Sequence, residues 1–526
     1  MVIRKALLGW AAAGLLAACT ATLDFDDECN QDSQCGTGLR CVQRLCVQGG
    51  AGGAGGAGDD MGGDLDAAPD QGPPADRGVD QGPDAQVDQG TAWPPALPPE
   101  CHTLHGVPAD AVWGADTVRF GVLLPSSGAL GAFGPSMAQA AFLAVDEVNQ
   151  INGLGNRKLA LIVCDTATDA DQSVRLAQWL VQQAKVPAIL GPAGSTNALR
   201  AFNEAALAGQ AVLITPSATS PALTDQQDQN LLWRTAPSDA IQGRAISAYL
   251  QAEGLQKVAV VNRDDAYGNG LTEAIRVSLC NARACTEANY FNRRYTEGAG
   301  DLSSVFAQVQ GFGPDVLVLI AYVEDGVELV NLAALAGIRR LILADGTKDT
   351  AMLEQVNDPQ ALADAVGTAP AAPAGDIYQA FLQRYTAQWG EGPGVFNAQS
   401  YDAMYLLAFA AGAAAEQGEL TGPALAQVLA RLSAGPRIQA GPTDFNRGMG
   451  LLRASAEATV DYVGASGELD FDGNGEAPND IEAWRFDVDG MAIESLGLMY
   501  TAGGEYMPVA AAPDMGAPAP EPDMGE

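Results

Sequence analysis

Side chains that could carry out catalysis are scarce in this sequence. Only two histidines occur in 526 residues, His102 and His105, and the chain from Gly106 to Glu526 has none. Histidine is the usual general base of nucleophilic triads and a common zinc ligand, so such sites are excluded from most of the chain. Neither a Gly-x-Ser-x-Gly nucleophile motif nor the glycine pattern of a dinucleotide site is present. These residues therefore give no support for an enzyme, a cofactor or a metal.

Ser195 is the residue whose position suggests ligand chemistry. It stands between a predicted strand at Ala188–Leu190 and a predicted helix at Asn197–Ala208. A hydroxyl and free backbone N–H groups at such a junction favour an anion, although a plain helix cap has the same appearance. Asp345 precedes Gly346, which by itself indicates a turn.

Composition restricts the possible partners. The chain contains 64 Asp and Glu against 28 Lys and Arg, for a formal net charge of -36. A nucleic-acid surface needs clustered cations that displace counterions, so nucleic acid is excluded as a partner. Hydrophobic residues make up 47% and aromatic residues 6%, so the core must be rich in Ala, Val and Leu. This length accommodates two to four domains.

The first residues indicate export. Residues 1–18 have a basic start at Arg4 and Lys5 and a short apolar stretch, as in a signal peptide. Leu16-Ala-Ala-Cys19 resembles a bacterial lipobox, which predicts a lipid anchor on Cys19 in the cell envelope, in the periplasm or at the outer membrane and cell surface. An ordinary signal peptide that contains a cysteine is the alternative.

Eight further cysteines fit an oxidising compartment. Four of them fall within 19–48, namely Cys29, Cys35, Cys41 and Cys46, in a segment too polar to bury a core. Two disulfides are expected to hold this small module, and a zinc site of four thiolates is the rival. Cys280 and Cys285 are close enough in sequence to pair, and Cys101 and Cys164 then pair by elimination.

Two segments have the composition of disordered chain. Residues 49–100 carry Gly-Ala-Gly runs and Asp-Gln-Gly-Pro units, and residues 510–526 repeat Pro-Asp-Met-Gly. Low hydrophobicity with many Gly, Pro and like charges predicts an extended tether and a disordered tail.

Between the tether and the tail, short apolar runs alternate with helical patterns. The predicted strands are 117–124, 159–164, 188–190, 211–215, 257–261, 289–291, 315–320 and 340–343. The predicted helices are 137–148, 170–184, 197–208, 240–253, 270–279, 302–309 and 326–336. Two such series predict an α/β fold of two doubly wound lobes with parallel sheets, whose ligands lie at the carboxyl ends of the strands.

Loop segments resemble the type I periplasmic solute-binding proteins, in particular the branched-chain amino-acid-binding group. These segments are Phe120-Gly-Val-Leu-Leu-Pro-Ser-Ser-Gly, Ala132-Phe-Gly-Pro, Ala144-Val-Asp-Glu-Val-Asn, Leu190-Gly-Pro-Ala-Gly-Ser195, Ile214-Thr-Pro-Ser-Ala-Thr-Ser220, Trp233-Arg-Thr-Ala-Pro-Ser-Asp, Asp265-Ala-Tyr-Gly-Asn-Gly, Ala344-Asp-Gly and Ser400-Tyr-Asp-Ala. The resemblance implies three crossovers that act as a hinge, with 116–237 and 367–478 in lobe 1 and 238–366 and 479–506 in lobe 2.

The resemblance also implies a ligand site in the cleft. On lobe 1, Ser195, Ser217, Ala218 and Thr219 match positions whose hydroxyl and backbone groups bind an amino acid's carboxylate. Phe133 stands where the family usually has Tyr, so it can wall the cleft but lacks a hydroxyl.

On lobe 2, Tyr267 and Tyr322 match tyrosines that close over the ligand. Asp345 matches the acid that receives the ligand ammonium, and a buried carboxylate is well served by such a counterion.

The expected function follows from this resemblance. The chain would capture an amino acid, an amide or a similar small zwitterion and deliver it to an ABC permease. A sensor of the same fold and an adhesive surface lipoprotein without ligand remain alternatives. Asp470-Phe-Asp-Gly-Asn-Gly475 begins like a calcium loop, but Ile481 occupies the position of the required acid, so we expect a turn.

Overall fold

The computed structural model describes residues 39–42, 45–48, 96–107, 116–298, 302–371, 373, 375–416, 418 and 420–508. The chain divides into two compact units, Met1–Gln86 and Val87–Glu526. In the first unit, β1 (Leu39–Val42) and β2 (Leu45–Gln48) form an antiparallel hairpin whose register pairs Cys41 with Cys46. The predicted signal peptide, Cys19, Cys29, Cys35 and the tail at 510–526 lie outside the described residues, as does the predicted tether up to residue 95.

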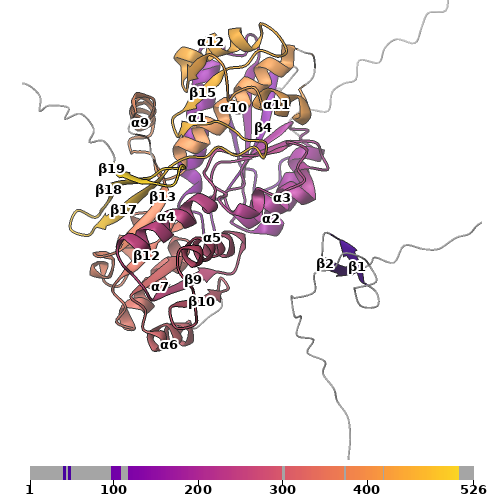
Figure 1. Ribbon diagram of the computed structural model, residues 1–526. Helices are drawn as coiled ribbons and strands as arrows, with labels where there is room; N and C mark the ends of the chain where they lie inside the picture. Colours follow the sequence, from indigo (N-terminus) through magenta and orange to yellow (C-terminus); the bar gives the residue numbers. More distant parts are fainter. Residues whose placement is uncertain are drawn as a thin grey trace, which may run out of the picture. The chain divides into compact units, whose positions relative to one another are not determined.

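The second unit begins with a six-stranded sheet that forms the centre of lobe 1 (Figure 1). Its order is β3-β5-β4-β6-β7-β8, and only β3 runs antiparallel to its neighbour. The strands are β3 (Thr103–His105), β4 (Thr117–Leu124), β5 (Lys158–Asp165), β6 (Ala188–Leu190), β7 (Val212–Thr215) and β8 (Leu232–Arg234). The five parallel strands, β4 to β8, are buried along most of their length, as expected for strands covered on both faces.

Helices from two distant parts of the chain cover this sheet. The first part supplies α1 (Gly134–Gln150), α2 (Ala170–Gln182), α3 (Ser195–Ala201) and the π-helical turn η2 (Phe202–Ala206). The returning part supplies α9 (Asp376–Trp389), α10 (Asn397–Glu416), α11 (Gly422–Leu429), α12 (Pro442–Leu452) and a small sheet of β14 (Arg437–Gln439), β15 (Asp461–Gly464) and β16 (Gly467–Glu468). Helix α10 is buried on nearly all sides, in keeping with its many Ala and Leu residues.

The eight-stranded sheet of lobe 2 has the order β10-β9-β11-β12-β13-β17-β18-β19. Its parallel half contains β9 (Val258–Arg263), β10 (Tyr290–Tyr295), β11 (Val316–Ile320), β12 (Leu341–Leu343) and β13 (Val366–Pro370). Its antiparallel half contains β17 (Ile481–Asp487), β18 (Ala492–Tyr500) and β19 (Tyr506–Pro508). The helical elements of this lobe are α4 (Asp239–Ala252), α5 (Ala266–Ala282), α6 (Ser303–Phe312), α7 (Val323–Leu335) and α8 (Ala351–Gln355), with 3-10 turns η4 (Asp345–Thr347) and η5 (Pro359–Leu362).

The chain crosses between the lobes three times. It leaves lobe 1 after β8, returns between β13 and α9, and leaves again between β16 and β17. The second crossing comes slightly later than expected, because β13 is parallel to β12 and antiparallel to β17. Residues 367–370 therefore belong to the sheet of lobe 2 rather than to lobe 1.

The parallel and antiparallel halves of this larger sheet meet where β13 pairs with β17, and there Gly367 lies opposite Trp484. Trp484 is fully buried and stands in register with Gly367 on the neighbouring strand. A Cβ atom added at Gly367 would come within 2.0 Å of the indole Cε2. The absence of a side chain at Gly367 allows the Trp484 indole to lie against β13.

Both disulfides that were expected in the second unit are present. Cys101–Cys164 fastens the segment before β3 to β5, and Cys280–Cys285 closes the end of α5. The amide of Asp165 also donates to the carbonyl of Glu100 at 2.8 Å. The tether predicted to reach residue 100 therefore ends earlier, since Leu97 already packs against the core.

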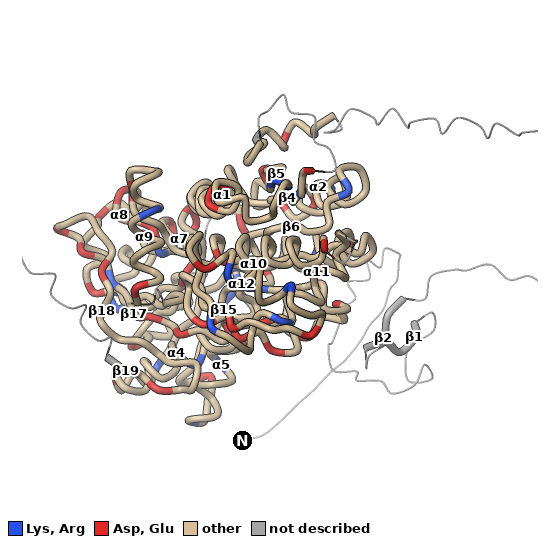
Figure 2. The backbone as a smooth tube through the Cα atoms, turned by 90° about the horizontal axis from the view of Figure 1, so that it is seen from above, with Lys and Arg blue, Asp and Glu red and all other residues tan. Residues whose placement is uncertain are grey.

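Lys and Arg positions are scattered among more numerous Asp and Glu positions over both lobes (Figure 2). Of the helices in the described part of the chain, none combines the length and the apolar character needed to cross a membrane. The same residues contain no group of three or more His, Cys, Asp and Glu that could hold a metal ion.

Candidate functional site

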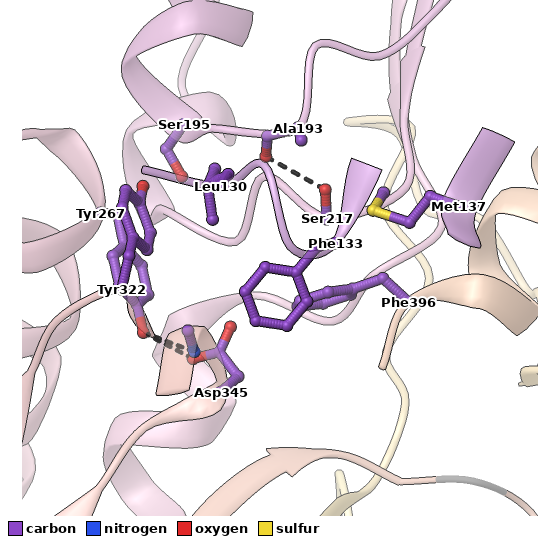
Figure 3. Close-up of a pocket in the computed structure, with 11 residues that line it drawn as sticks. Leu130, Phe133, Met137, Ala193, Ser195, Ser217, Tyr267, Tyr322, Asp345 and Phe396 are labelled. Carbon is purple, nitrogen blue, oxygen red and sulfur yellow. Dashed lines mark hydrogen bonds between the residues drawn. The ribbon is translucent and has the colours of Figure 1, made fainter. Parts of the chain in front are cut away.

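A cavity lies between the two lobes, where the loops after several strands meet (Figure 3). It encloses about 350 Å³, counting the part open to solvent. Both lobes contribute to its wall, as the crevice at the carboxyl ends of parallel strands leads one to expect. The lining residues are Leu130, Phe133, Met137, Ala193, Ser195, Ser217, Tyr267, Tyr322, Asp345, Gly346 and Phe396.

Two serines place hydroxyl groups on the lobe 1 side. Ser195 is the first residue of α3, after the loop that follows β6, and it is 2% exposed. Its Oγ accepts a hydrogen bond from the amide of Ser220 at 3.2 Å, which leaves the hydroxyl proton available to a ligand. Ser217 Oγ donates to the carbonyl of Ala193 at 3.1 Å, so its oxygen can still accept.

Ala218 and Thr219, expected beside these serines, do not line the cavity. The Ala218 amide donates to Thr215 Oγ1 at 3.1 Å, and Thr219 Oγ1 donates to Asp239 Oδ2 at 3.0 Å. Because a hydroxyl has a single proton, the Thr219 side chain cannot also donate to a ligand carboxylate. In this structure its oxygen is an acceptor, which is opposite to the role inferred from the sequence.

Asp345 provides the charge in the described lining. It begins η4, directly after the loop that follows β12, and it is 2% exposed. Its Oδ1 accepts hydrogen bonds from the Tyr267 hydroxyl at 2.8 Å and from Gln242 Nε2 at 3.0 Å. Burial raises the pKa of Asp345, and the two hydrogen bonds oppose that rise. A cation that entered the cavity would compensate the buried charge.

Asp239 is a second buried acid near the cavity, and the sequence reasoning missed it. It is the first residue of α4, on the crossover from lobe 1, and it is fully buried. Its Oδ1 has no hydrogen-bond partner among the described residues. Burial, followed by the nearby Asp345 carboxylate, raises its pKa well above the usual value. In sequence, Asp239 looks like an ordinary residue of a first helical turn, and its place at the end of the recognised segment Trp233-Arg-Thr-Ala-Pro-Ser-Asp is the signal that could have marked it.

Two tyrosines form the opposite wall. The rings of Tyr267 and Tyr322 stack with centroids 5.4 Å apart and planes 7° from parallel (Figure 3). Behind them, the guanidinium of Arg263 lies 4.2 Å from the centroid of the Tyr322 ring. Arg263 is itself held by Asp265 and Asp325 at 2.9 and 2.6 Å. The tyrosine wall is therefore fixed from the interior of lobe 2.

The remaining lining is apolar. Phe133, one of the expected residues, is 5% exposed and lines the cavity together with Phe396 (Figure 3). Leu130, Met137 and Phe396 were not expected, because each is indistinguishable in sequence from a core residue. Ala193 and Gly346 were also missed, although both occur inside the recognised loop segments.

Arg234 braces the loop behind Ser217 at the first crossover. It is 1% exposed, and its Nη1 donates to the carbonyls of Thr219 and Ser220 at 2.8 and 2.9 Å. Its Nη2 forms an ion pair of 2.7 Å with Glu476, which lies near the third crossover. Glu476 belongs to the segment that begins like a calcium loop, where Asp472 Oδ1 accepts from the Glu476 amide at 3.1 Å. These acids thus serve a turn and an ion pair.

Comparisons with known proteins agree with this geometry. The family model described as "Periplasmic binding protein" matches residues 117–463, more than half of the chain. A Leu/Ile/Val-binding protein, BraC3 of Rhizobium johnstonii, is 31% identical over 235 residues, which are 44% of this chain and 62% of that relative. The aligned region thus spans less than two thirds of the relative's length.

Solved structures give the same fold. A leucine-binding protein of Thermotoga maritima has a TM-score of 0.61 at 20% identity, covering 72% of this chain and 97% of its own. An ABC transporter substrate-binding protein of Desulfitobacterium hafniense in complex with Leu has a TM-score of 0.55 at 25% identity, covering 72% and 100%. The chain belongs to the periplasmic binding protein family and has the type I fold of the branched-chain amino-acid-binding proteins.

Proposed function

We propose that this chain is a non-enzymatic solute-binding protein that captures an α-amino acid with an apolar side chain between its two lobes. The observation that carries the proposal is the placement of Asp345 opposite Ser195 and Ser217 around one apolar cavity. Asp345 would pair with the ligand ammonium from lobe 2. The Ser195 hydroxyl, whose proton is free, would donate to the ligand carboxylate from lobe 1, so a zwitterion would join both lobes.

The lining of the cavity supports a small apolar side chain. Only about 20 Å³ of the cavity is free for a water-sized molecule, so an amino acid would enter only after the two lobes part. Leu130, Phe133, Met137 and Phe396 offer hydrocarbon and aromatic surface, and burying an aliphatic side chain there contributes about 1.5–3 kcal/mol. A polar or charged side chain would lose its hydration without a fixed partner on these four residues.

The proposed setting is the cell envelope. The predicted signal peptide and a lipid on Cys19 would anchor the chain outside the cytoplasm, and the predicted tether would let the binding unit range from the membrane. The usual partner of such a protein is an ABC permease, and the names of the relatives in amino-acid binding and transport support this assignment.

A ligand panel tests the proposal on the full chain. We expect L-leucine, L-isoleucine or L-valine to raise the unfolding temperature, since a ligand at 100 times its Kd adds about 2.7 kcal/mol of stability. Two leucine analogues serve as matched controls: 4-methylpentanoate, which lacks the ammonium, and 3-methylbutylamine, which lacks the carboxylate. Both controls should bind far more weakly than leucine. The proposal fails if no amino acid stabilises the chain or if the analogues bind as well as leucine.

A further inference from the structure

A second cavity adjoins the first one. It encloses about 780 Å³, counting the part open to solvent, and Phe396 lines both cavities. The loop after β12 also contributes to both, with Asp345 in the first and Lys348 in the second. Two cavities that share a phenylalanine and a four-residue loop are within the reach of one extended side chain.

The partition between the cavities has a strained backbone. Phe396 has φ +66, in the left-handed region that a bulky side chain rarely adopts. It lies in a turn in which the Asn397 amide donates to the Gly394 carbonyl at 3.4 Å. Glycine is the residue that such a position favours, so an aromatic ring has been retained there at a conformational cost.

The polar side chain of Gln399 is available at the second cavity. Gln399 lines the cavity and is 4% exposed, and no hydrogen bond joins its side-chain amide to the described residues. Trp484 also lines the cavity, but its Nε1 is enclosed and has no accessible surface to offer. A ligand carbonyl that reaches the cavity would therefore find its donor in the Gln399 amide.

The charges at this cavity cancel. Lys348 forms an ion pair with Glu482, with side chains 17% and 12% exposed. A charged ligand end would have to compete with this pair, whereas a neutral end would leave it intact. The surrounding apolar surface comes from Tyr378, Pro393 and Ile493.

We propose that the second cavity holds the distal end of a long, uncharged amino-acid side chain that carries an amide. This inference rests on the proposed function, because the α-ammonium and α-carboxylate would remain at Asp345 and Ser195. The side chain would pass Phe396 and offer its amide carbonyl to the Gln399 side-chain N–H₂. Nε-acyl lysines have this length and this chemistry.

Isothermal calorimetry on the full chain tests the inference with Nε-acetyl-L-lysine, L-lysine and L-leucine. We expect Nε-acetyl-L-lysine to bind and L-lysine to bind at least about tenfold more weakly, because its charged end would have to compete with Lys348 for Glu482. If leucine binds and Nε-acetyl-L-lysine does not, the inference is wrong and the proposed function stands. If neither binds, the proposed function fails and the inference falls with it.

Variants locate the distal end of the side chain. Ser495→Trp fills the exposed mouth of the second cavity, and Gln399→Leu removes its amide. Both should weaken Nε-acetyl-L-lysine about tenfold and leave leucine unchanged, since a lost hydrogen bond or a blocked cavity acts only on the longer ligand. Glu494→Trp, on the neighbouring exposed residue that does not line the cavity, is the matched control and should change neither. Equal weakening of both ligands, or of neither, would contradict the proposal.

Phe396→Gly gives an independent readout that does not depend on filling the cavity. Glycine removes the ring and relieves the left-handed backbone, so the protein should remain folded. Leucine should bind more weakly because it loses an apolar wall, and Nε-acetyl-L-lysine should bind as well as before or better. The reverse order would show that the ring does not separate the two cavities.

Discussion

Replacing Asp345 with Asn should change ligand affinity and stability in opposite directions. Asn is nearly isosteric, and its Oδ1 can keep the hydrogen bonds from Tyr267 and Gln242, which are 2.8 and 3.0 Å long in the wild type. The substitution therefore removes the charge and little else. A ligand ammonium would then be buried without its counterion, which costs about 2–5 kcal/mol, or about 30-fold to several-thousand-fold in Kd.

The stability change without ligand follows from the raised pKa of Asp345. A carboxyl group with a raised pKa in the folded state stabilises the protein most below its unfolded pKa of about 3.9, and this contribution is lost as the pH rises through the folded value. At neutral pH the wild type bears the cost of a buried charge that the Asn variant avoids. The ligand-free variant should therefore be the more stable protein at pH 8, and the difference should shrink towards pH 4.

Calorimetry with leucine and 4-methylpentanoate, together with urea unfolding, measures both effects. Asp349→Asn is the matched control, because Asp349 lies four residues further on, does not line the cavity and accepts from the Ala351 amide. The reasoning is refuted if leucine loses less than about fivefold in Kd, or if 4-methylpentanoate, which has no ammonium, is weakened as much as leucine.

Three further outcomes are expected. Leucine affinity should fall, by at most about tenfold per pH unit, as acid protonates Asp345 below its raised pKa, and calorimetry in buffers of different ionisation heat should detect proton release on binding. Asp402→Asn should lower the free energy of unfolding by about 2–4 kcal/mol in urea, because the Asp402 carboxylate accepts from Tyr462, Ala465 and Ser466 and an amide N–H₂ would oppose these donors. This loss should outweigh the relief of the buried charge, since burial raises the pKa of Asp402 only to about 6. Serine replacement of the Cys101–Cys164 pair, which spans 63 residues, should cost about 4 kcal/mol, against about 2 kcal/mol for Cys280–Cys285, and unfolding both variants under identical conditions compares them.

The parallel strands of both lobes could be predicted from the sequence. The predicted strand at 117–124 coincides with β4, and 315–320 differs from β11 by one residue, because buried parallel strands appear as continuous apolar runs bounded by polar residues. The prediction placed the second crossover at 366–367. Strand β13 is short and contains Gly367 and Pro370, so its composition resembles a loop.

The candidate site was predictable only where loop segments are distinctive. Ser195, Ser217, Tyr267, Tyr322 and Asp345 meet at one cavity because each comes shortly after a parallel strand, at the carboxyl-end edge of the sheet of its own lobe. Side-chain direction does not follow from position. The proton of Thr219 is directed to Asp239, a residue twenty positions away whose burial depends on the packing of the two lobes.

Apolar members of the site could not be separated from the core. Phe396 and Met137 carry no mark in sequence, since a phenylalanine or methionine within or next to a helix usually packs inside the protein. Only the three-dimensional arrangement shows that these side chains face an enclosed space between the lobes.

The position of Arg234 has a consequence for how such a protein can evolve. The Arg234 guanidinium donates to two carbonyls of the loop behind Ser217 and also forms an ion pair with Glu476. The ligand-binding loop and the segment before the third crossover therefore depend on the same side chain. A substitution of Arg234 that broadened the range of ligands would at the same time disturb the angle between the two lobes. New specificities should therefore arise more readily on the lobe 2 wall, around Tyr322 and Lys348, because neither residue takes part in the contacts of Arg234.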